Sequence, residues 1–521
     1  MTAATDLASA SPLASPFATV SPLGGTLAEV RATPVAEIPG IVARARAAQK
    51  EWSERTIDAR VHTLRRLKDR VLDAAARISG VVSREIGKPE IEAWSAEVLG
   101  TADVVDYWCA SIDEHLAEMT VAIDPMAYPS KRGTITRAPR GVIAVIAPWN
   151  FPFALPLRTI VPALLSGNAV VLKPSEIAPR SGALIGDMLA GLLPDDLFAV
   201  VQGGGDVGGA LCEADVDLVA FTGSVATGRK VARACAERLV PCALELGGKD
   251  AAIVLADANL ERAANGIVWG ALTNAGQNCA SVERVYVERS IEAAFTEKVL
   301  AAVRSLKAGD DVGPLATARQ CTIVREHVED ARANGAKILV GGSAGEGSYA
   351  FAPTVLSVAS DDLAIMRDET FGPVIPIAVV ENEEEAITRA NASRFGLTAS
   401  VWTRDVARGA RIAQRLRAGV VTVNNHAFTG ALPSAPWSGY GESGYGITGS
   451  PLALDALTRP RFVLLDRNSS PREVWWFPYT PALRTVLASM SILRSRTSGL
   501  LAKVRAVWDL VRAMPKRLGG G

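Results

Sequence analysis

The residue of this chain with the clearest potential for covalent chemistry is Cys279, in the stretch TNAGQNCASVER at 273–284. A cysteine becomes a strong nucleophile as its thiolate, and the usual activator is a nearby histidine or another positive charge. The four histidines stand at positions 62, 115, 327 and 426, so none is close to the cysteine in sequence. Either Cys279 is a packing residue, or a group other than histidine activates it.

Two other polar residues stand in apolar segments where chemistry is a reasonable expectation. Glu245 lies in the apolar run CALELGGKD, and burial raises the pKa of such a carboxyl toward the range of a general base. Asn150 lies in APWNFPF, where an apolar wall would hold its amide rigidly as a donor to a developing oxyanion. A thiol, a carboxylate and an amide on separate elements are consistent with acyl transfer. The alternative for Asn150 alone is an ordinary turn residue.

A nucleotide site is indicated by LKPSE at 172–176, which ends a buried strand. Glu176 at the mouth of a sheet can accept from the two hydroxyls of an adenosine ribose, and Lys173 can reach the same sugar. A 2'-phosphate beside Glu176 would be repelled, which favours NAD over NADP, although Lys173 and Arg180 can offset that repulsion. The alternative is a surface ion pair.

The pyrophosphate is expected at FTGSVATGRKV, residues 221–231, where Gly223 and Ser224 stand at a predicted helix N-terminus. The run GGGDVG at 203–208 also matches the pattern GxGxxG, but no acidic residue follows about 20 positions later. We therefore prefer the turn at 221–231 and keep Gly203 as a further candidate contact.

These residues must be positioned by a fold, and the alternation of apolar runs with helical patterns along the chain predicts an α/β fold. Helical patterns fill residues 41–120; from about 141, short apolar β-branched runs such as GVIAVIAP and VDLVAFTG alternate with helix-length segments. This alternation is typical of a parallel sheet buried on both faces, in a Rossmann-like doubly wound nucleotide-binding domain. A second α/β domain is expected from DAAIVLA to about Asn425. At 521 residues the chain has room for two to four domains, at roughly 150 residues each.

Composition limits the classes of partner. Lys and Arg number 55, as do Asp and Glu, so there is no global field for nucleic acid. The six cysteines form no CxxC pair, which argues against a zinc site or a disulfide framework and favours a reducing cytoplasm. No window of about 18 uninterrupted apolar residues predicts a spanning helix. Residues 1–20 are rich in Ala, Ser and Pro and are expected to be a disordered tail, with no signal peptide.

The C-terminal residues 481–521 hold eight basic residues and one acid, Asp509. Their helical pattern places Leu500, Val504, Trp508 and neighbouring apolar residues on one face, with basic residues on the other. Such a helix suits an anionic membrane surface, or alternatively a groove on its own oligomer.

Seven motifs occur in the order found in the aldehyde dehydrogenase superfamily, which the chain resembles from about Gly24 to about Asp466. They are PWNFP (148–152), LKPSE (172–176), FTGS (221–224), ELGGK (245–249), NAGQNC (274–279), ETFGPV (369–374) and PWSGYGESGYG (436–446). The resemblance implies an NAD-binding domain, a catalytic domain, an oligomerisation arm and a C-terminal extension. Their expected bounds are 21–121 with 138–247, 248–445, 122–137 with 456–466, and 467–521.

The resemblance also implies roles for single residues. Cys279 is expected to attack the aldehyde, Glu245 to act as the base, and Asn150 with the Cys279 N–H to form the oxyanion hole. The expected contacts of NAD, with NADP still open, are Trp149, Lys173, Glu176, Gly203, Gly223, Ser224, Gly247, Glu369 and Phe371. A carboxylate and the positively charged cofactor ring would then replace the missing histidine. No metal is expected.

The implied reaction is oxidation of an aldehyde to its acid through a Cys279 thiohemiacetal and thioester. The alternatives are a succinate-semialdehyde-type or CoA-acylating enzyme of the same fold, and a catalytically silent relative that serves as a structural or binding protein. Apolar residues expected in the pocket (Trp149, Phe153, Trp269, Phe428) favour an aliphatic or aromatic aldehyde. Gly441 departs from the lysine of many relatives, which leaves the substrate-side wall open. We expect a cytoplasmic homodimer or homotetramer, with a membrane contact through the C-terminal helix as a further expectation.

Overall fold

The computed structural model describes residues 16–125, 128, 130–344, 349–426 and 428–518. Contacts within it divide the chain into two compact units, one formed by residues 1–117 with 137–459 and the other by 118–136 with 460–521. The first unit holds two large sheets, each with its own hydrophobic core, and a two-stranded hairpin near the N-terminus.

The first sheet has the order β7-β6-β5-β8-β9, and all of its strands are parallel. Its strands are β5 (Val142–Ile146), β6 (Ala169–Lys173), β7 (Phe198–Val200), β8 (Leu218–Thr222) and β9 (Cys242–Glu245). Every residue of β5 and β6 is buried, as their continuous apolar sequences predict. The chain adds β6 and β7 on one side of β5 and then β8 and β9 on the other. This reversal beside β5 creates the crevice where doubly wound sheets bind ligands.

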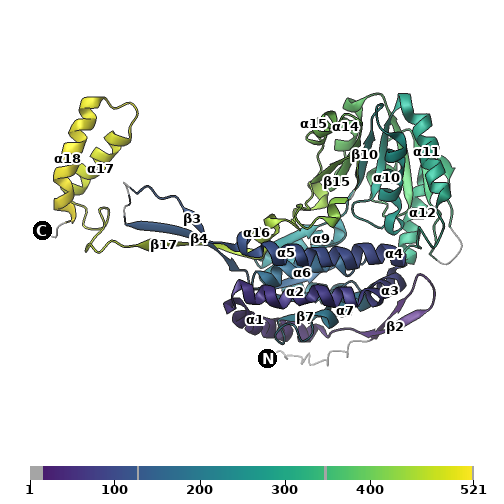
Figure 1. Ribbon diagram of the computed structural model, residues 1–521, viewed down its shortest axis with the longest axis horizontal. Helices are drawn as coiled ribbons and strands as arrows, with labels where there is room; N and C mark the ends of the chain where they lie inside the picture. Colours follow the sequence, from purple (N-terminus) through teal and green to yellow (C-terminus); the bar gives the residue numbers. More distant parts are fainter. Residues whose placement is uncertain (1–15, 126–127, 129, 345–348, 427, 519–521) are drawn as a thin grey trace, which may run out of the picture. The chain divides into compact units, whose positions relative to one another are not determined.

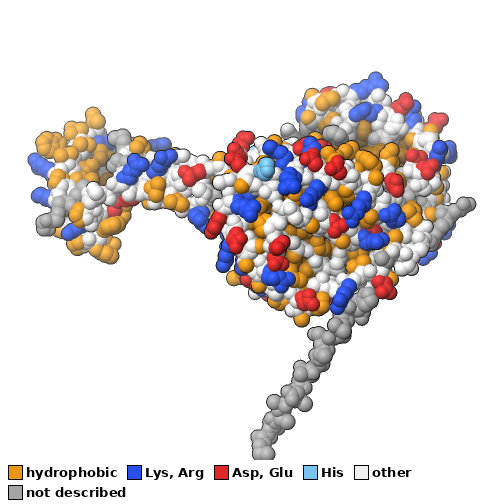
Figure 2. All heavy atoms as spheres, turned by 60° about the horizontal axis from the view of Figure 1, so that its bottom comes forward, with side chains coloured by type: hydrophobic (Ala, Val, Ile, Leu, Met, Phe, Trp, Pro, Cys, Tyr) orange, Lys and Arg blue, Asp and Glu red, His pale blue; other side chains and the backbone are white. Residues whose placement is uncertain are grey.

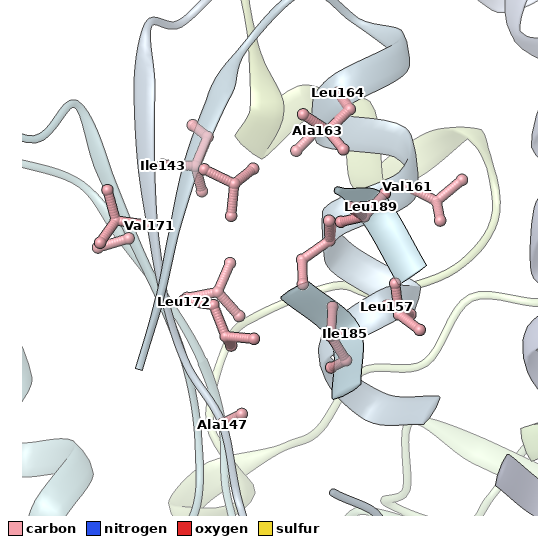
Figure 3. Packing of buried hydrophobic residues seen from close by; sticks show 14 of the residues in the cluster. Ile143, Ala147, Leu157, Val161, Ala163, Leu164, Val171, Leu172, Ile185 and Leu189 are labelled. Carbon is pink, nitrogen blue, oxygen red and sulfur yellow. The ribbon is translucent and has the colours of Figure 1, made fainter. Parts of the chain in front are cut away.

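Helices cover this sheet on its faces. The connecting helices are α6 (Ala154–Leu165), α7 (Pro179–Leu189), α8 (Gly205–Glu213) and α9 (Val225–Glu237). The N-terminal helices are α1 (Ile38–Glu54), α2 (Ile57–Asp73), α3 (Ala75–Ile86), α4 (Glu90–Ala93) and α5 (Gly100–Leu116), with a π-helical turn at Trp94–Leu99. Figure 3 shows Ile143 and Leu172 from the strands beside Leu157 of α6 and Ile185 of α7. This packing fixes the strand ends on which the site is built.

The second sheet has the order β12-β13-β14-β11-β10-β15-β16, parallel except for β12. Its strands are β10 (Asp250–Val254), β11 (Val282–Glu288), β12 (Lys337–Val340), β13 (Thr354–Val358), β14 (Val374–Val380), β15 (Thr398–Trp402) and β16 (Val420–Val423). The helices are α10 (Leu260–Leu272), α11 (Glu292–Ser305), α12 (Ala318–Ala333), α13 (Ala364–Arg367), α14 (Glu383–Asn391) and α15 (Val406–Ala413). In Figure 1, α10, α11 and α12 (teal) flank this sheet. The short helix α16 (Leu454–Leu457) packs in the core of the first sheet.

The expected N-terminal tail is wrong for residues 16–20. These residues form β1 (Pro16–Val20), which pairs antiparallel with β2 (Thr26–Arg31). Thr19 is buried, and the Ser21 hydroxyl donates to the carbonyl of Arg84, so the hairpin has partners that composition did not reveal. Residues 1–15 of the predicted tail lie outside the described part.

The second unit contains an antiparallel sheet and a helical hairpin. β3 (Met119–Val121) and β17 (Thr458–Asp466) flank β4 (Lys131–Pro139). The expected strand-like arm segments are therefore strands at 131–139 and 458–466. The extension that follows folds into α17 (Pro481–Arg494) and α18 (Leu500–Leu518), which pack on each other. Among the described helices, none combines the length and apolar character needed to cross a bilayer.

Candidate active site

Cys279 lies in a loop between α10 and β11. The turn that leads into this loop has a left-handed backbone conformation that non-glycine residues rarely adopt. It is a 3-10 turn (Thr273–Gly276), in which both Asn274 and Ala275 have φ of 54°. Left-handed backbone at non-glycine residues costs free energy and persists only where neighbours hold it. Here the Glu92 carboxylate accepts from the Asn274 N–H at 2.8 Å.

Gly276 in the same loop is required by space as well as by its φ of 71°. A Cβ at this position would lie 2.1 Å from the carbonyl oxygen of Gly372. The loop that carries the thiol therefore lies directly on the chain that follows Phe371.

The structure brings Asn150 to the Cys279 loop. The Asn150 Nδ2 donates to the Gln277 carbonyl at 3.2 Å, and the Asn274 Nδ2 donates at 3.0 Å to the carbonyls of both Asn150 and Gln277. Asn150 is buried, with 4% of its surface exposed. Since a primary amide has two N–H donors, this bond leaves one N–H of Asn150 for another acceptor.

Glu245 is the last residue of β9 and is buried, with 4% of its surface exposed. The Thr222 hydroxyl donates to its Oε2 at 3.4 Å, whereas Oε1 is buried without a hydrogen-bond partner among the described residues. Burial raises the pKa of Glu245 to about 7, although the Arg158 guanidinium and the Thr222 hydroxyl act in the opposite direction. The carboxyl is thus poised to accept a proton near neutral pH.

The Cys279 thiol lies in the same electrostatic environment. Burial raises its pKa well above the ordinary value, and the carboxyls of Glu245, Asp250 and Glu369 raise it further. At rest the cysteine therefore carries its proton. A base is needed to form the thiolate, and Glu245, with a pKa of about 7, is partly ionised at neutral pH and can serve as that base.

The carboxyl edge of the first sheet presents groups that fit a dinucleotide. Lys173 ends β6, and its Nζ lies 3.1 Å from the Glu176 carboxylate. Ser224 is the N-cap of α9, with Gly223 before it, and its Oγ accepts from the Thr227 N–H. The first N–H groups of a 13-residue helix at a topological switch point favour phosphate oxygens. Ribose and pyrophosphate of NAD thus have suitable partners here.

Glu369 reaches this region from the second sheet. Its Oε1 accepts from the Gly248 N–H at 3.0 Å, and a Cβ on Gly247 would lie 2.3 Å from its Oε2. Only glycine at 247 leaves room for this carboxyl, which explains the glycine pair of ELGGK. Burial raises the pKa of Glu369 to about 8. Phe371 meets the Trp149 ring edge to face, with 5.5 Å between ring centroids.

Glu283 is a buried positioning residue that sequence reasoning missed. It lies on β11 with 3% of its surface exposed, and its carboxylate contacts the Lys249 Nζ at 2.5 Å. It also accepts from the backbone N–H groups of Thr370 and Phe371, both at 2.8 Å. Its strand, VERVYVE, also carries Arg284 and Glu288, so no single charge in an apolar run marked Glu283 in the sequence.

The remaining predicted residues have different outcomes. Gly203 has φ of 147° in the turn before α8, and a Cβ there would lie 2.4 Å from Val207, so its cofactor contact stays a prediction. Phe153 was wrong as a pocket residue, because it is fully buried in the first hydrophobic core. Trp269 is 54% exposed and lines an open groove with Trp402 and several polar residues. The side chain of Phe428 lies outside the described part.

A doubly wound nucleotide-type sheet, joined to a second α/β sheet whose loop brings a thiol near the buried Glu245 carboxyl, is the architecture of a nucleotide-dependent oxidoreductase. Residues 9–463 match the aldehyde dehydrogenase family, and the chain belongs to it. The enzyme is an aldehyde dehydrogenase that uses NAD(P).

The relatives and solved structures agree with this family. The chain is 39% identical to 4,4'-diapolycopene aldehyde oxidase of Methylomonas sp. over 89% of this chain and 88% of the relative. It is 36% identical to the putative succinate-semialdehyde dehydrogenase [NADP(+)] 2 of Mycobacterium bovis (strain BCG / Pasteur 1173P2), over 89% and 92%. A putative aldehyde dehydrogenase from Burkholderia cenocepacia superposes with a TM-score of 0.84 at 32% identity, over 88% and 96%. An indole-3-acetaldehyde dehydrogenase in complex with NAD+ superposes with a TM-score of 0.83 at 31% identity, over 88% of this chain and 94% of that one.

Proposed function

We propose that Cys279 is the nucleophile, Glu245 the general base and Asn150 the oxyanion donor of aldehyde oxidation. The observation that carries this proposal is the pairing of a protonated thiol with a buried carboxyl whose pKa is about 7. Glu245 takes the proton from Sγ, and the thiolate attacks the aldehyde carbon. The free N–H of the Asn150 amide and the N–H of Cys279 donate to the oxygen as it gains charge.

The second half of the reaction uses the same residues. Bound NAD or NADP supplies the hydride acceptor. The acyl group then remains on Cys279 as a thioester. Glu245 releases to solvent the proton that it took from Sγ and then takes one from the water that hydrolyses the thioester, which frees the carboxylic acid and the Cys279 thiol. A CoA-acylating relative has no need of a carboxyl for this hydrolysis, so Glu245 favours the hydrolytic reaction.

Steady-state formation of NADH with a simple aldehyde tests the proposal. We expect Cys279→Ala to abolish activity, while Cys321→Ala, a cysteine with no part in the site, retains it. Full activity in the Cys279 variant would refute the mechanism. NADH formation that depends on added CoA would instead identify the acylating alternative.

We propose residues 21–121 with 138–247 as the NAD-binding domain and 248–445 as the catalytic domain. Trp149, Lys173, Glu176, Gly203, Gly223, Ser224, Gly247, Glu369 and Phe371 are the proposed cofactor contacts. The Lys173–Glu176 pair supports NAD, because a 2'-phosphate would meet the carboxylate. The ratio of kcat/KM for NAD to that for NADP, measured before and after Glu176→Gln, tests this; an unchanged ratio would remove Glu176 from cofactor selection.

We propose an aliphatic or aromatic aldehyde as the substrate. The relatives are named for 4,4'-diapolycopene aldehyde and for succinate semialdehyde, so a lipophilic and an anionic aldehyde are the two cases to separate. A panel of long-chain, aromatic and succinic-semialdehyde substrates does so through kcat/KM. Preference for succinic semialdehyde would contradict the proposal.

We propose a cytoplasmic homodimer or homotetramer whose arm pairs across the subunit interface. The residues that support this lie on β17, where Phe462, Val463, Leu464 and Leu465 are all exposed. Among the described strands β17 pairs only with β4, and exposed apolar side chains on a strand with such an open edge favour pairing with a second copy. Sedimentation equilibrium should show a dimer or tetramer, and a monomer would contradict the assignment.

We also propose that the C-terminal hairpin contacts an anionic membrane surface. Its helix α18 buries Ala506 and Ala513, while the predicted apolar face stays exposed: Leu500 79%, Val504 52%, Val507 48%, Trp508 60% and Val511 62%. Figure 2 shows hydrophobic side chains gathered over this hairpin with Lys and Arg among them. α18 therefore docks on α17 through small residues and leaves its large ones in solvent.

An aromatic loop extends this apolar surface. Arg517 is 1% exposed, and its guanidinium donates to the carbonyls of Val474, Trp476 and Pro478. The loop thus held to α18 presents Phe477 (75% exposed) and Tyr479 (71% exposed). Aromatic side chains and basic residues beside an apolar face are the composition that binds anionic lipid surfaces.

Co-sedimentation of the full-length protein with vesicles, with and without anionic lipid, tests the membrane contact. We expect binding that requires anionic lipid and is lost in Trp508→Ser/Val511→Ser. Leu239→Ser, which removes a 92% exposed leucine from the first unit, is the matched control and should bind normally. Equal vesicle binding by both variants would refute the contact. A change of oligomeric state without lost vesicle binding would instead assign the face to a second copy.

A further inference from the structure

One charged side chain beside the site has no role in the scheme above, and it is buried. Arg158 lies on α6 with 8% of its surface exposed. Its Nη1 donates to the Gly430 carbonyl at 2.6 Å and its Nη2 to the Leu432 carbonyl at 3.2 Å. Its Nε is buried and has no hydrogen-bond partner among the described residues.

The residues around the Arg158 guanidinium leave space for it but do not neutralise its charge. A Cβ on Gly449, whose φ is 68°, would lie 2.8 Å from Nη2 and 3.3 Å from Nε. The two recorded partners of Arg158 are neutral backbone carbonyls, and within the described residues no carboxylate forms an ion pair with it. Burying a cation without a paired anion is costly, so the presence of this charge here indicates a function.

Arg158 and Glu245 line the same small cavity of about 30 Å³, together with Thr222. The ionisable groups that interact with Arg158 through space are Glu245 and Cys279, the two groups proposed to carry out the chemistry. The Thr222 hydroxyl is the hydrogen-bond partner of the Glu245 carboxylate among the described residues, while Cys279 interacts electrostatically with the acids Glu245, Asp250 and Glu369. Among these groups Arg158 supplies the only positive charge acting on Glu245.

We propose that Arg158 is a positioning residue that keeps one negative charge on the Cys279–Glu245 pair at neutral pH. Two buried acids in an apolar site would both hold their protons, which would leave neither a thiolate nor a base. The cation stabilises the state in which the pair holds one proton. That proton moves from Sγ to the Glu245 carboxylate as the thiolate attacks, so the total charge of the pair is unchanged.

The inference rests on the proposed roles of Cys279 and Glu245, and the site answers the question raised by the absent histidine. The cation near the nucleophile comes from α6 of the nucleotide-binding sheet, eight residues after Asn150. It contacts no reacting atom. It acts through the ionisation of the other two groups, and the pair therefore titrates as a unit.

The test is the pH dependence of Cys279 alkylation by iodoacetamide in the full-length protein, followed on the peptide that contains Cys279. We expect Arg158→Met to move the profile to higher pH and to slow alkylation at pH 7 by roughly 10-fold, the effect of losing a nearby opposite charge. Arg158→Lys keeps the charge and should restore most of the rate. Arg158→Gln is a second neutral variant, which keeps amide donors for Gly430 and Leu432 and should behave like Met.

Arg60→Met is the matched control, because Arg60 is also buried and also donates to backbone carbonyls, those of Leu165, Ser53 and Arg55. It should leave the alkylation profile unchanged. Profiles for Arg158→Gln and Arg158→Met that match wild type would overturn the inference.

Activity assays separate the remaining outcomes. If the neutral variants raise only the KM for succinic semialdehyde and leave that for hexanal and the pH profile unchanged, Arg158 binds a substrate carboxylate and the positioning role is wrong. If Cys279→Ala keeps its activity, the proposed function itself fails. An inactive Cys279→Ala beside unshifted Arg158 variants would refute only the inference.

Discussion

The burial of Glu245 predicts that this carboxyl destabilises the fold in the pH range where it works. Its pKa rises from 4.5 to about 7 on folding. At about 1.4 kcal/mol for each unit, keeping the ionised form buried costs roughly 3 kcal/mol. Glu245→Gln retains the size of the side chain and removes the charge.

The sign follows from proton linkage. Between pH 4.5 and 7 the folded protein binds the proton that the unfolded chain has released, so stability falls as pH rises through this window. Below pH 4.5 both states are protonated and the penalty is absent. We therefore expect Glu245→Gln to be more stable than wild type at pH 8, and to match it at pH 4.5.

Under the proposed role of Glu245 as general base, the same titration sets the activity. With a pKa of about 7, roughly a tenth of Glu245 is ionised at pH 6 and about nine tenths at pH 8, so base-limited turnover should rise about 10-fold between them. Glu245→Gln should lose this rise and turn over slowly at both values.

Two assays decide the matter: thermal unfolding at pH 4.5 and pH 8, and steady-state NADH formation from pH 6 to pH 8. A variant less stable than wild type at pH 8 would show that Glu245 is held as a favourable ion pair, against the burial argument. Wild-type turnover in the variant would remove Glu245 from the mechanism.

Three further changes test the supports of the site. Gly276→Ala should abolish activity, because its Cβ would overlap the Gly372 carbonyl at 2.1 Å; wild-type kcat would show that the loop can move aside. Lys249→Met leaves Glu283 buried and unpaired and should cost about 3–5 kcal/mol in urea unfolding at pH 8; a loss under about 1 kcal/mol would contradict this. Glu92→Ala removes the acceptor of the Asn274 N–H and should lower kcat several-fold with little change in KM for NAD; an unchanged kcat would show that the strained turn needs no support.

Much of the fold was predictable because its strands have simple signatures. The runs at β5, β6, β8 and β10 are nearly continuous and apolar, which is typical of strands in a parallel sheet that helices cover on both faces. Pro16–Val20 was missed because its short hairpin with β2 has no apolar run, and because the next residue, Ser21, is held by the Arg84 carbonyl, a partner distant in sequence.

The site was predictable where a residue conflicted with its own segment. Glu245 stood out as a carboxylate in an apolar strand, and the fold places it beside a thiol whose proton it can take. Arg158 conflicts with its segment in the same way, because it is the single charged residue of the apolar helix Ala154–Leu165, but it was not singled out from the sequence. Phe153 was misassigned because its motif pointed to the pocket, while its side chain packs in the core.

The position of Glu283 has a consequence for how the site withstands thermal motion. Cys279 lies four residues before Glu283, and Glu283 at the start of β11 holds the backbone of Thr370 and Phe371 through two hydrogen bonds. A displacement of β11 therefore moves the thiol and the loop at Phe371 in the same direction. Their separation is better preserved than the absolute position of either, so the strand can fluctuate without misaligning the two.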